Sequence, residues 1–166
     1  MAVGDLSGDG DQEFVAGNKI NYGSVSIRLG DGQGGFSGTT EIAVKSYPTS
    51  VTVGDFNGDG SPDLAAANQV PNSVSIRLGD GQGGFSGATE IAVGSSPQSV
   101  AIGDFNGDGA QDIATANYDT SGSVSIRLGD GQGGFTGTTD IVVISHTKSV
   151  PVGAFNGDVH QDIPTT

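Results

Sequence analysis

The sequence predicts an all-β fold built from repeated units of about 50 residues, and three observations support this prediction. An acidic nonapeptide begins at residues 5, 55, 104 and 154, so its copies are 50, 49 and 50 residues apart. Thirty glycines argue against helices, while the short Val, Ala and Ile runs have the composition of strands. The segment VSIRLGDGQGGF is identical at 25–36, 74–85 and 124–135. A period of about 40 to 50 residues with four strands is typical of a β-propeller blade.

The second repeat shows the predicted order of elements most clearly. We expect strands at 50–54, 64–67, 73–78 and 88–93, with the acidic loop between the first two and a glycine-rich turn between the last two. Because the faces of blades pack on neighbouring blades, small side chains are expected on them. Apolar and polar side chains alternate in the third strand, with Val74, Ile76 and Leu78 on one face and Ser73, Ser75 and Arg77 on the other.

In this interpretation residues 1–166 form one repeat domain, with blades at 1–49, 50–98 and 99–148 and a partial, degenerate fourth repeat at 149–166. Three blades and a fragment would leave apolar faces and strand edges exposed. We therefore expect oligomerisation to close the ring, most simply as a homodimer with about three blades per chain. The alternative is that the chain is a piece of a longer propeller, natural or engineered.

The acidic nonapeptide has the spacing of a calcium-binding loop, Asp-x-Asn-x-Asp-Gly-x-x-Asp. Calcium takes about six to eight oxygen ligands, which side chains at positions 1, 3, 5 and 9 and the carbonyl at position 7 can supply. The glycine at position 6 allows the sharp turn. Strands rather than helices flank the loop, so it is not an EF-hand. The predicted ligands are Asp5, Ser7, Asp9, Asp11 and Glu13 in the first loop, Asp55, Asn57, Asp59, Ser61 and Asp63 in the second, and Asp104, Asn106, Asp108, Ala110 and Asp112 in the third.

We expect about three Ca²⁺ ions per chain. The fourth copy has Ala154 at position 1 and Val159 at position 6, so Asn156, Asp158 and Asp162 are not expected to hold an ordered ion. The alternative is that the nonapeptides are only Asx-rich and glycine-rich turns. Against this alternative, the acidic side chains of each copy crowd into nine residues and repel one another without a cation.

The charge balance restricts the partners. The 166 residues include 19 acidic and 6 basic side chains, for a net charge of −13, so we expect neither nucleic acid nor an anionic membrane as a partner. No apolar run approaches membrane-spanning length, so we expect no insertion into a membrane. Without cysteine, metal and oligomerisation remain as stabilising devices. Met1 leads almost directly into the first acidic loop, so no export signal is expected within this sequence. Millimolar extracellular calcium would fill weak sites, which favours an extracellular or cell-surface location.

The glycine-rich turn from Gly30 to Gly35 matches the Gly-x-Gly-x-x-Gly fingerprint of nucleotide-binding proteins. No helix follows to present its N-terminus to a phosphate, and the turn occurs three times, so a hairpin turn is predicted instead. Phe36, Phe85 and Phe135, which follow the three turns, are expected to be core side chains.

The repeated arginines Arg28, Arg77 and Arg127 have two interpretations. They can bind an anionic ligand, but a structural pair with a neighbouring Asp is the commoner role of an arginine among carboxylates. His146 and His160 are not repeated and belong to no recognisable metal or catalytic set. With no Ser/His/Asp set either, we do not expect an enzyme.

Two segments of the second repeat carry a family resemblance: VTVGDFNGDGSPDLAAAN, followed by SVSIRLGDGQGGF. They resemble the FG-GAP/VCBS repeats, and the resemblance extends over essentially the whole chain. Similar repeats build the propeller head of integrin α subunits, fungal tandem-repeat lectins and many secreted bacterial adhesins. The resemblance implies a calcium-stabilised propeller that binds other molecules rather than transforming them.

The function expected from these features is noncatalytic recognition or adhesion, with a glycan or a cell-surface protein as ligand. Repeated sites between blades would favour avidity for a multivalent surface. The scarcity of aromatic side chains, with no Trp and only Tyr22, Tyr47 and Tyr118, weakens the lectin version. The alternative is a purely structural, self-assembling propeller fragment, or a designed or duplicated scaffold, whose only ligand is calcium.

Overall fold

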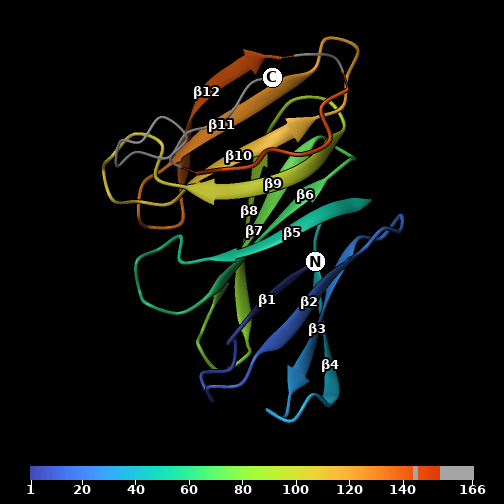
Figure 1. Cartoon of the computed structure of the whole chain (residues 1–166), viewed down its shortest axis with the longest axis vertical. Helices are drawn as coiled ribbons and strands as arrows, with labels where there is room; N and C mark the ends of the chain where they lie inside the picture. Colours follow the sequence, from blue (N-terminus) through green and yellow to red (C-terminus); the bar gives the residue numbers. More distant parts are fainter. Residues whose placement is uncertain (144–145, 154–166) are drawn as a thin grey trace.

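A computed structural model describes residues 1–143 and 146–153 of the chain, which form three four-stranded antiparallel sheets (Figure 1). In these ranges every regular element is a strand, and none is a helix able to cross a membrane. The first sheet contains β1 (Ala2–Gly4), β2 (Glu13–Asn18), β3 (Ser24–Gly30) and β4 (Phe36–Ala43). The second contains β5 (Pro48–Gly54), β6 (Asp63–Asn68), β7 (Ser73–Gly79) and β8 (Phe85–Ala92). The third contains β9 (Pro97–Gly103), β10 (Asp112–Asn117), β11 (Ser123–Gly129) and β12 (Phe135–Val142).

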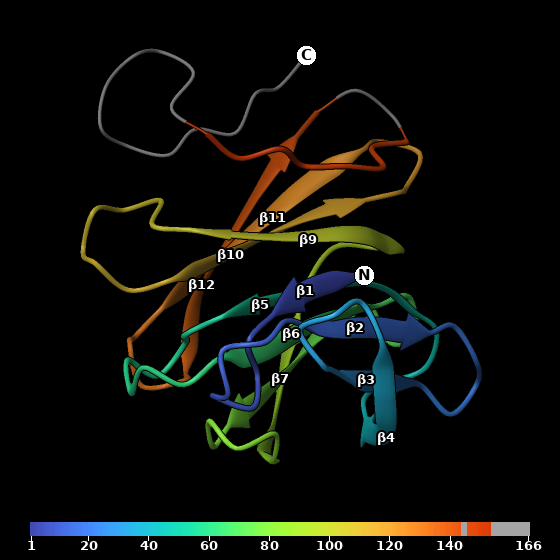
Figure 2. The ribbon, with the colours of Figure 1, turned by 60° about the horizontal axis from the view of Figure 1, so that its bottom comes forward.

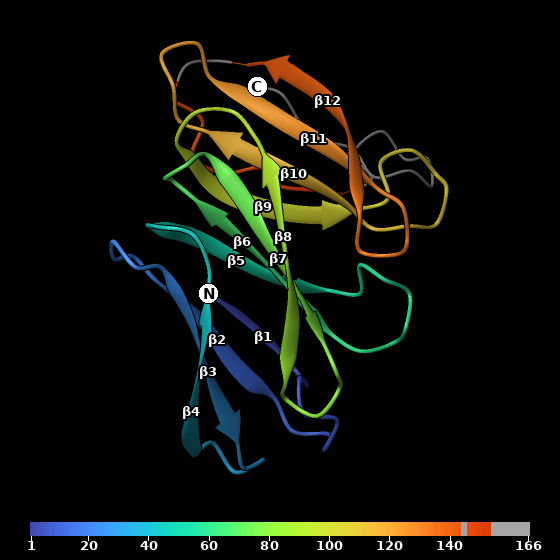
Figure 3. The ribbon, with the colours of Figure 1, turned by 180° about the vertical axis from the view of Figure 1, so that it is seen from behind.

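Each sheet is a simple meander in which neighbours in sequence are neighbours in space. The three sheets stand in a row, with the second between the other two, and the row is open at both ends (Figures 1 and 3). The first strand of a sheet packs on the second strand of the preceding sheet, since β5 contacts β2 and β9 contacts β6. This arrangement confirms the all-β prediction and the propeller-like blades, and we refer to the three sheets as the first, second and third blade.

Apolar side chains fill the space between successive blades. Leu6, Val15 and Val25 of the first blade pack with Val51 and Leu64 of the second, and all five are at most 4% exposed. A second cluster joins the second and third blades in the same way. Burial of this kind contributes about 25 cal/mol per Å² of apolar surface, so the contacts between blades stabilise the whole row.

The far side of the third blade carries a smaller cluster. Val150, which is 5% exposed, covers Ala114, Ala116 and Val124 there. Val150 therefore occupies, against the third blade, the position that Val51 occupies against the first blade. Figure 2 shows this segment beside the third blade, at the end of the row away from the first blade.

The fourth strand begins earlier than the sequence predicts. We expected it at 88–93, whereas β8 runs from Phe85 to Ala92. The pairing of β7 with β8 shifts register between Ile76 and Leu78, and Gly87 has a φ of 76°. The bulge breaks the alternation from which the start of a strand is predicted.

The predicted core role of the three phenylalanines holds for two of them. Phe85 packs against the cluster between the first and second blades, and Phe135 against the cluster between the second and third. Phe36 is 59% exposed, so its prediction was wrong. Phe85 and Phe135 are covered by the blade that precedes theirs, and no blade precedes the first one in the structure.

Candidate functional site

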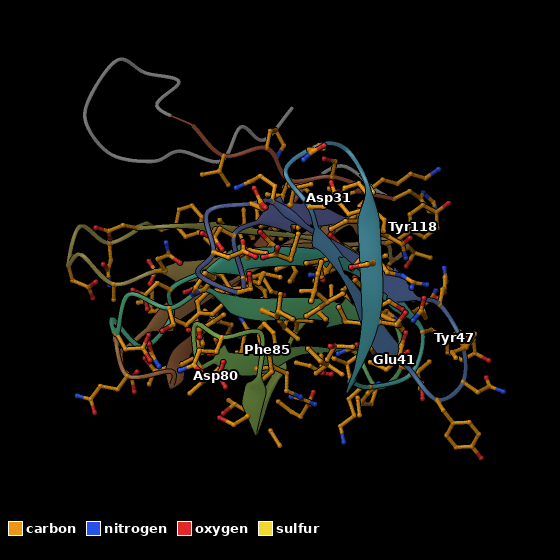
Figure 4. All side chains as sticks on the ribbon, turned by 90° about the horizontal axis from the view of Figure 1, so that it is seen from below. Asp31, Glu41, Tyr47, Asp80, Phe85 and Tyr118 are labelled. Atoms are coloured by element: carbon orange, nitrogen blue, oxygen red, sulfur yellow. The ribbon has the colours of Figure 1, made fainter. Side chains whose placement is uncertain are left out.

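The acidic loops and the glycine-rich turns lie at the same end of the blades. The amide of Gly83 donates to the carbonyl of Leu6 in the first acidic loop at 3.0 Å, and Gly133 donates to Phe56 in the second loop at 2.9 Å. Figure 4 shows Asp80 and Phe85 of one glycine-rich turn together, with Tyr47 and Tyr118 on the opposite side of the molecule. The turns of the second and third blades therefore contact the acidic loop of the preceding blade.

The first aspartate of each acidic loop shapes the turn. Asp55 accepts hydrogen bonds from the amides of Gly58 at 2.7 Å and Gly60 at 3.0 Å, and Asp5 and Asp104 bond the corresponding glycines. Gly60 has a φ of 84°, a left-handed conformation that favours glycine. Position 6 of the nonapeptide is therefore glycine for a backbone reason that holds with or without a metal.

The side chains at positions 3 and 5 contact each other. In the second loop the amide nitrogen of Asn57 donates to Asp59 at 2.8 Å, and the Ser61 backbone amide donates to the other oxygen of Asp59 at 2.7 Å. These two donors, with Ser61 the stronger, hold the pKa of Asp59 below its ordinary value of 3.8. Asn106 and Asp108 repeat the contact at 2.7 Å in the third loop. Asp59 thus presents an exposed carboxylate that is charged near neutral pH.

The aspartate at position 9 is buried and clamps two parts of the blade together. Asp63 is 0% exposed, and its oxygens accept from the amides of Phe56 and Gly79, both at 2.8 Å. Asp112 makes the same two bonds in the third blade. Burial raises the pKa of Asp63, and the nearby charges of Asp59 and Asp55 raise it further. Sequence reasoning assigned position 9 to the metal and missed this clamp between the acidic loop and the third strand.

The first loop carries Glu13 at position 9, and the clamp is incomplete there. Glu13 Oε2 accepts from the amides of Leu6 at 2.5 Å and Ser7 at 3.1 Å. Glu13 Oε1 and Ser7 Oγ are both buried and have no hydrogen-bond partner in the described part of the chain. Both belong to the predicted ligand set. A buried oxygen without a partner costs about 1–3 kcal/mol, so the first loop has two oxygens that a cation would satisfy.

The donor chemistry of the loops fits calcium, although the carboxylates do not converge. Across residues 1–143 and 146–153, no three His, Asp or Glu side chains gather as a metal-binding group. The carboxylates at positions 1 and 5 have lone pairs beyond the bonds described, since a carboxylate accepts about four hydrogen bonds. Asn, Ser and backbone oxygens complete a set of hard donors, which calcium prefers. The fourth nonapeptide lies outside the described residues.

A groove of about 320 Å³ lies between the second and third blades. Hydroxyl groups, an aromatic ring and charged side chains line it, so the groove combines apolar surface with a few polar groups, as small-molecule sites do. It is lined by Thr89, Glu90, Ile91 and Ala92 of β8 and by Arg127, Phe135, Gly137 and Thr138 of the next blade.

The repeated arginines make structural contacts. Arg77 pairs with Glu90 at 3.1 Å and Arg127 with Asp140 at 3.2 Å, which confirms the structural interpretation for these two, with Glu in place of Asp in the first pair. Arg28 is exposed and instead donates to the carbonyl of Gly38 at 2.9 Å. Arg28 differs from the other two arginines because it lies at the open end of the row, where no preceding blade offers it a carbonyl in the structure.

A polar network on each blade was not predicted. Asn68 donates to Ser75 at 2.8 Å, and Ser75 donates to Glu90 at 2.8 Å. Asn18 and Ser26 form the same contact at 2.6 Å in the first blade. The repetition of Asn, Ser and an acidic residue at equal spacing was the signal that could have revealed the network.

Comparison with known proteins identifies the family. The family model for the FG-GAP-like repeat matches three overlapping segments, 5–66, 55–115 and 104–163. The chain belongs to the FG-GAP repeat family. No curated protein matches this FG-GAP chain at a significant level.

Among solved structures, one similar to this FG-GAP chain is an Agrocybe aegerita lectin, described as specifically recognising non-reducing terminal N-acetylglucosamine. The match has a TM-score of 0.64 and 22% identity, and it covers 97% of this chain. This chain spans 44% of the length of that lectin chain. At this identity the match shows a shared fold.

Proposed function

We propose that this protein is a noncatalytic recognition module that binds glycans in the grooves between its blades and is stabilised by calcium in its acidic loops. The observation that carries the glycan part is the groove between the second and third blades, where Thr89, Thr138 and Phe135 line one hollow. Hydroxyls and an aromatic ring in one concave site suit the polar edges and apolar faces of a sugar. Family membership and the fold shared with a lectin support the same class of ligand.

The calcium part rests on two oxygens of the first loop, Glu13 Oε1 and Ser7 Oγ, which have no hydrogen-bond partner within residues 1–143 and 146–153. Positions 1, 3, 5, 7 and 9 of the three loops would hold about three ions per chain. Bound calcium would neutralise mutual repulsion among the carboxylates and fix the loops at one end of the blades. An extracellular or cell-surface location, where calcium is abundant, belongs to this proposal.

A glycan array probed in calcium tests the ligand, followed by calorimetric titration with an oligosaccharide that ends in N-acetylglucosamine. We expect binding, and we expect Thr138→Arg to weaken it because the longer side chain fills the groove between the second and third blades. Thr120→Arg is the matched control, since Thr120 is exposed and does not line the groove. A blank array with folded protein would refute glycan recognition.

The competing function is a structural scaffold whose only ligand is calcium. The arginines favour it, because Arg77 and Arg127 are already committed to carbonyls and carboxylates of the protein. A protein that binds calcium but no glycan or cell-surface partner would support this alternative.

A further inference from the structure

The first blade exposes a face that the other two blades bury. We call the side of a blade that packs on the preceding blade its leading face, and the opposite side its trailing face. On the leading face of the second blade Leu64 is 1% and Ala66 0% exposed. Their counterparts Phe14 and Ala16 in the first blade are half-buried, and Phe36 is 59% exposed. This leading face has the composition of a blade interface without a blade against it.

The two internal interfaces show how a leading face bonds its neighbour. Arg77 Nε donates to the carbonyl of Ala43 at 3.0 Å, and Arg127 Nε donates to the carbonyl of Ala92 at 2.9 Å. In both cases the acceptor is the last residue of the fourth strand of the preceding blade. Arg28 is the third copy of this arginine, and the acceptor at the corresponding place is the carbonyl of Val142, which ends β12.

A glutamine contact gives the interface a second marker. Gln111 Oε1 accepts from the backbone amide of Asp55 in the preceding blade at 2.9 Å. The second blade has Pro62 at this position, but the first blade has Gln12. A hollow of about 360 Å³ lies beside Gln12 and Phe36. The first blade therefore carries the glutamine that the third blade uses at its interface, and the matching donor on a third blade is the backbone amide of Asp104.

The trailing face of the third blade is partly covered. Val150 covers its inner part, as described above. Farther out, Ile126 is half-buried, whereas Ile27 and Ile76 in the other blades are each 1% exposed. The outer strands of the third blade thus lack the neighbour that covers the other two.

We propose that the leading face of the first blade docks on the trailing face of the third blade of a second copy of this chain. A two-fold axis then generates two identical seams and closes a ring of about six blades. Outside the part that Val150 already covers, each seam repeats contacts of the internal ones: Phe36 packs on Phe105 of the second copy as Phe135 packs on Phe56, whose ring centroids are 5.7 Å apart. Arg28 donates to the carbonyl of Val142 of that copy. Gln12 accepts from the backbone amide of its Asp104.

The length of the lectin that shares the fold agrees with this assembly. This chain matches 44% of that lectin, whose chain is thus more than twice as long as the matched part. The inference deepens the proposed function, since each seam adds a groove between blades. It does not depend on that function, because the assembly forms without a glycan.

Sedimentation equilibrium in calcium tests the assembly through its mass. We expect twice the 16.5 kDa of one chain. Phe36→Glu places an unpaired charge in both seams and should weaken the dimer by about a hundredfold or more. Circular dichroism should not change, because Phe36 is largely exposed within one chain. Tyr22→Glu is the matched control, since Tyr22 is 91% exposed and belongs to the loop between β2 and β3 rather than to a strand of either face.

Cross-linking supplies a second readout in case Phe36→Glu disturbs the fold. The chain has no cysteine, so Phe36→Cys chains can be mixed with Phe105→Cys chains and treated with a short bismaleimide. We expect a cross-linked dimer, and none when Tyr22→Cys replaces Phe36→Cys. A folded monomer at about 100 μM, far above the Kd of stable dimers, would overturn the inference, as would a dimer that Phe36→Glu leaves intact. A monomer that binds glycans would refute the assembly alone, and a dimer that binds none would refute glycan recognition alone.

Discussion

The clamp made by Asp63 gives the sharpest test of how the acidic loops work. Replacing Asp63 by Ala removes the acceptor for the amides of Phe56 and Gly79, which each lie 2.8 Å from its carboxylate. Hydrogen bonds to a charged group are worth about 1.5–3 kcal/mol each, so two of them amount to about 3–6 kcal/mol. The whole stability of a domain of this size is about 5–15 kcal/mol. We therefore expect Asp63→Ala to lose a large part of the free energy of unfolding.

Urea unfolding of Asp63→Ala, followed by circular dichroism in calcium and in chelator, measures this loss. If Asp63 stabilises the backbone without a metal, most of the loss in the free energy of unfolding remains in chelator. Asp59→Ala is the control from the same loop: Asp59 is exposed, so its loss should appear mainly in calcium. A loss for Asp63→Ala of less than about 1 kcal/mol in chelator would refute the clamp, because two buried amides cannot lose a charged acceptor so cheaply.

Three further predictions follow from the same geometry. Asp104→Ala should lower the melting temperature more in calcium than in chelator; an equal loss in both would mean that the loop matters only as a turn. The amides of Gln82 and Gly84 lower the pKa of Asp80, so its stabilising effect is complete above 3.8 and is lost as the pH falls through the lowered value. Asp80→Asn should therefore flatten the acid side of stability measured by urea unfolding across pH, and an unchanged profile would contradict this. Arg127→Lys should lower the free energy of unfolding, measured in urea, by about 1–3 kcal/mol, since an ammonium cannot reproduce the guanidinium bonds to Ala92, Ile126 and Asp140. An unchanged free energy of unfolding would show that these guanidinium bonds add no stability.

The repeat made most of the fold predictable. A fixed period and the alternation of Val74 and Ile76 with Ser73 and Ser75 are local signals, and they define four strands per blade. The start of β8 was not predictable in this way, because the register shift beyond Ile76 depends on pairing with the neighbouring strand. The exposure of Phe36 was also beyond the sequence, since identical segments have identical local propensity and differ only in which blade lies against them.

The sequence predicted which residues belong to the candidate site, but not the separate structural role of each one. Spacing alone placed Asp55, Asp59 and Asp63 in one loop, and the structure brings all three there. Spacing could not reveal that Asp63 faces backbone amides in the interior, because its partner Gly79 lies 16 residues away on another strand. The contacts of Arg77 and Arg127 with the preceding blade are likewise long-range and have no local signature.

The turn interpretation of the acidic loops explains part of their chemistry. Asp80 lies outside the predicted calcium loops, yet it accepts from the amide two residues later at 2.8 Å, as Asp59 does at 2.7 Å. Aspartate at such a position therefore needs no metal. Two observations go beyond a turn: burial, with a smaller contribution from the charges of Asp59 and Asp55, raises the pKa of Asp63, and Glu13 Oε1 is buried without a hydrogen-bond partner among the described residues. A sequence selected only to form a turn would avoid a buried carboxylate among charges and a buried oxygen without a partner. A bound cation would offset the cost of both. The argument for calcium therefore depends on these two features more than on the count of acidic residues.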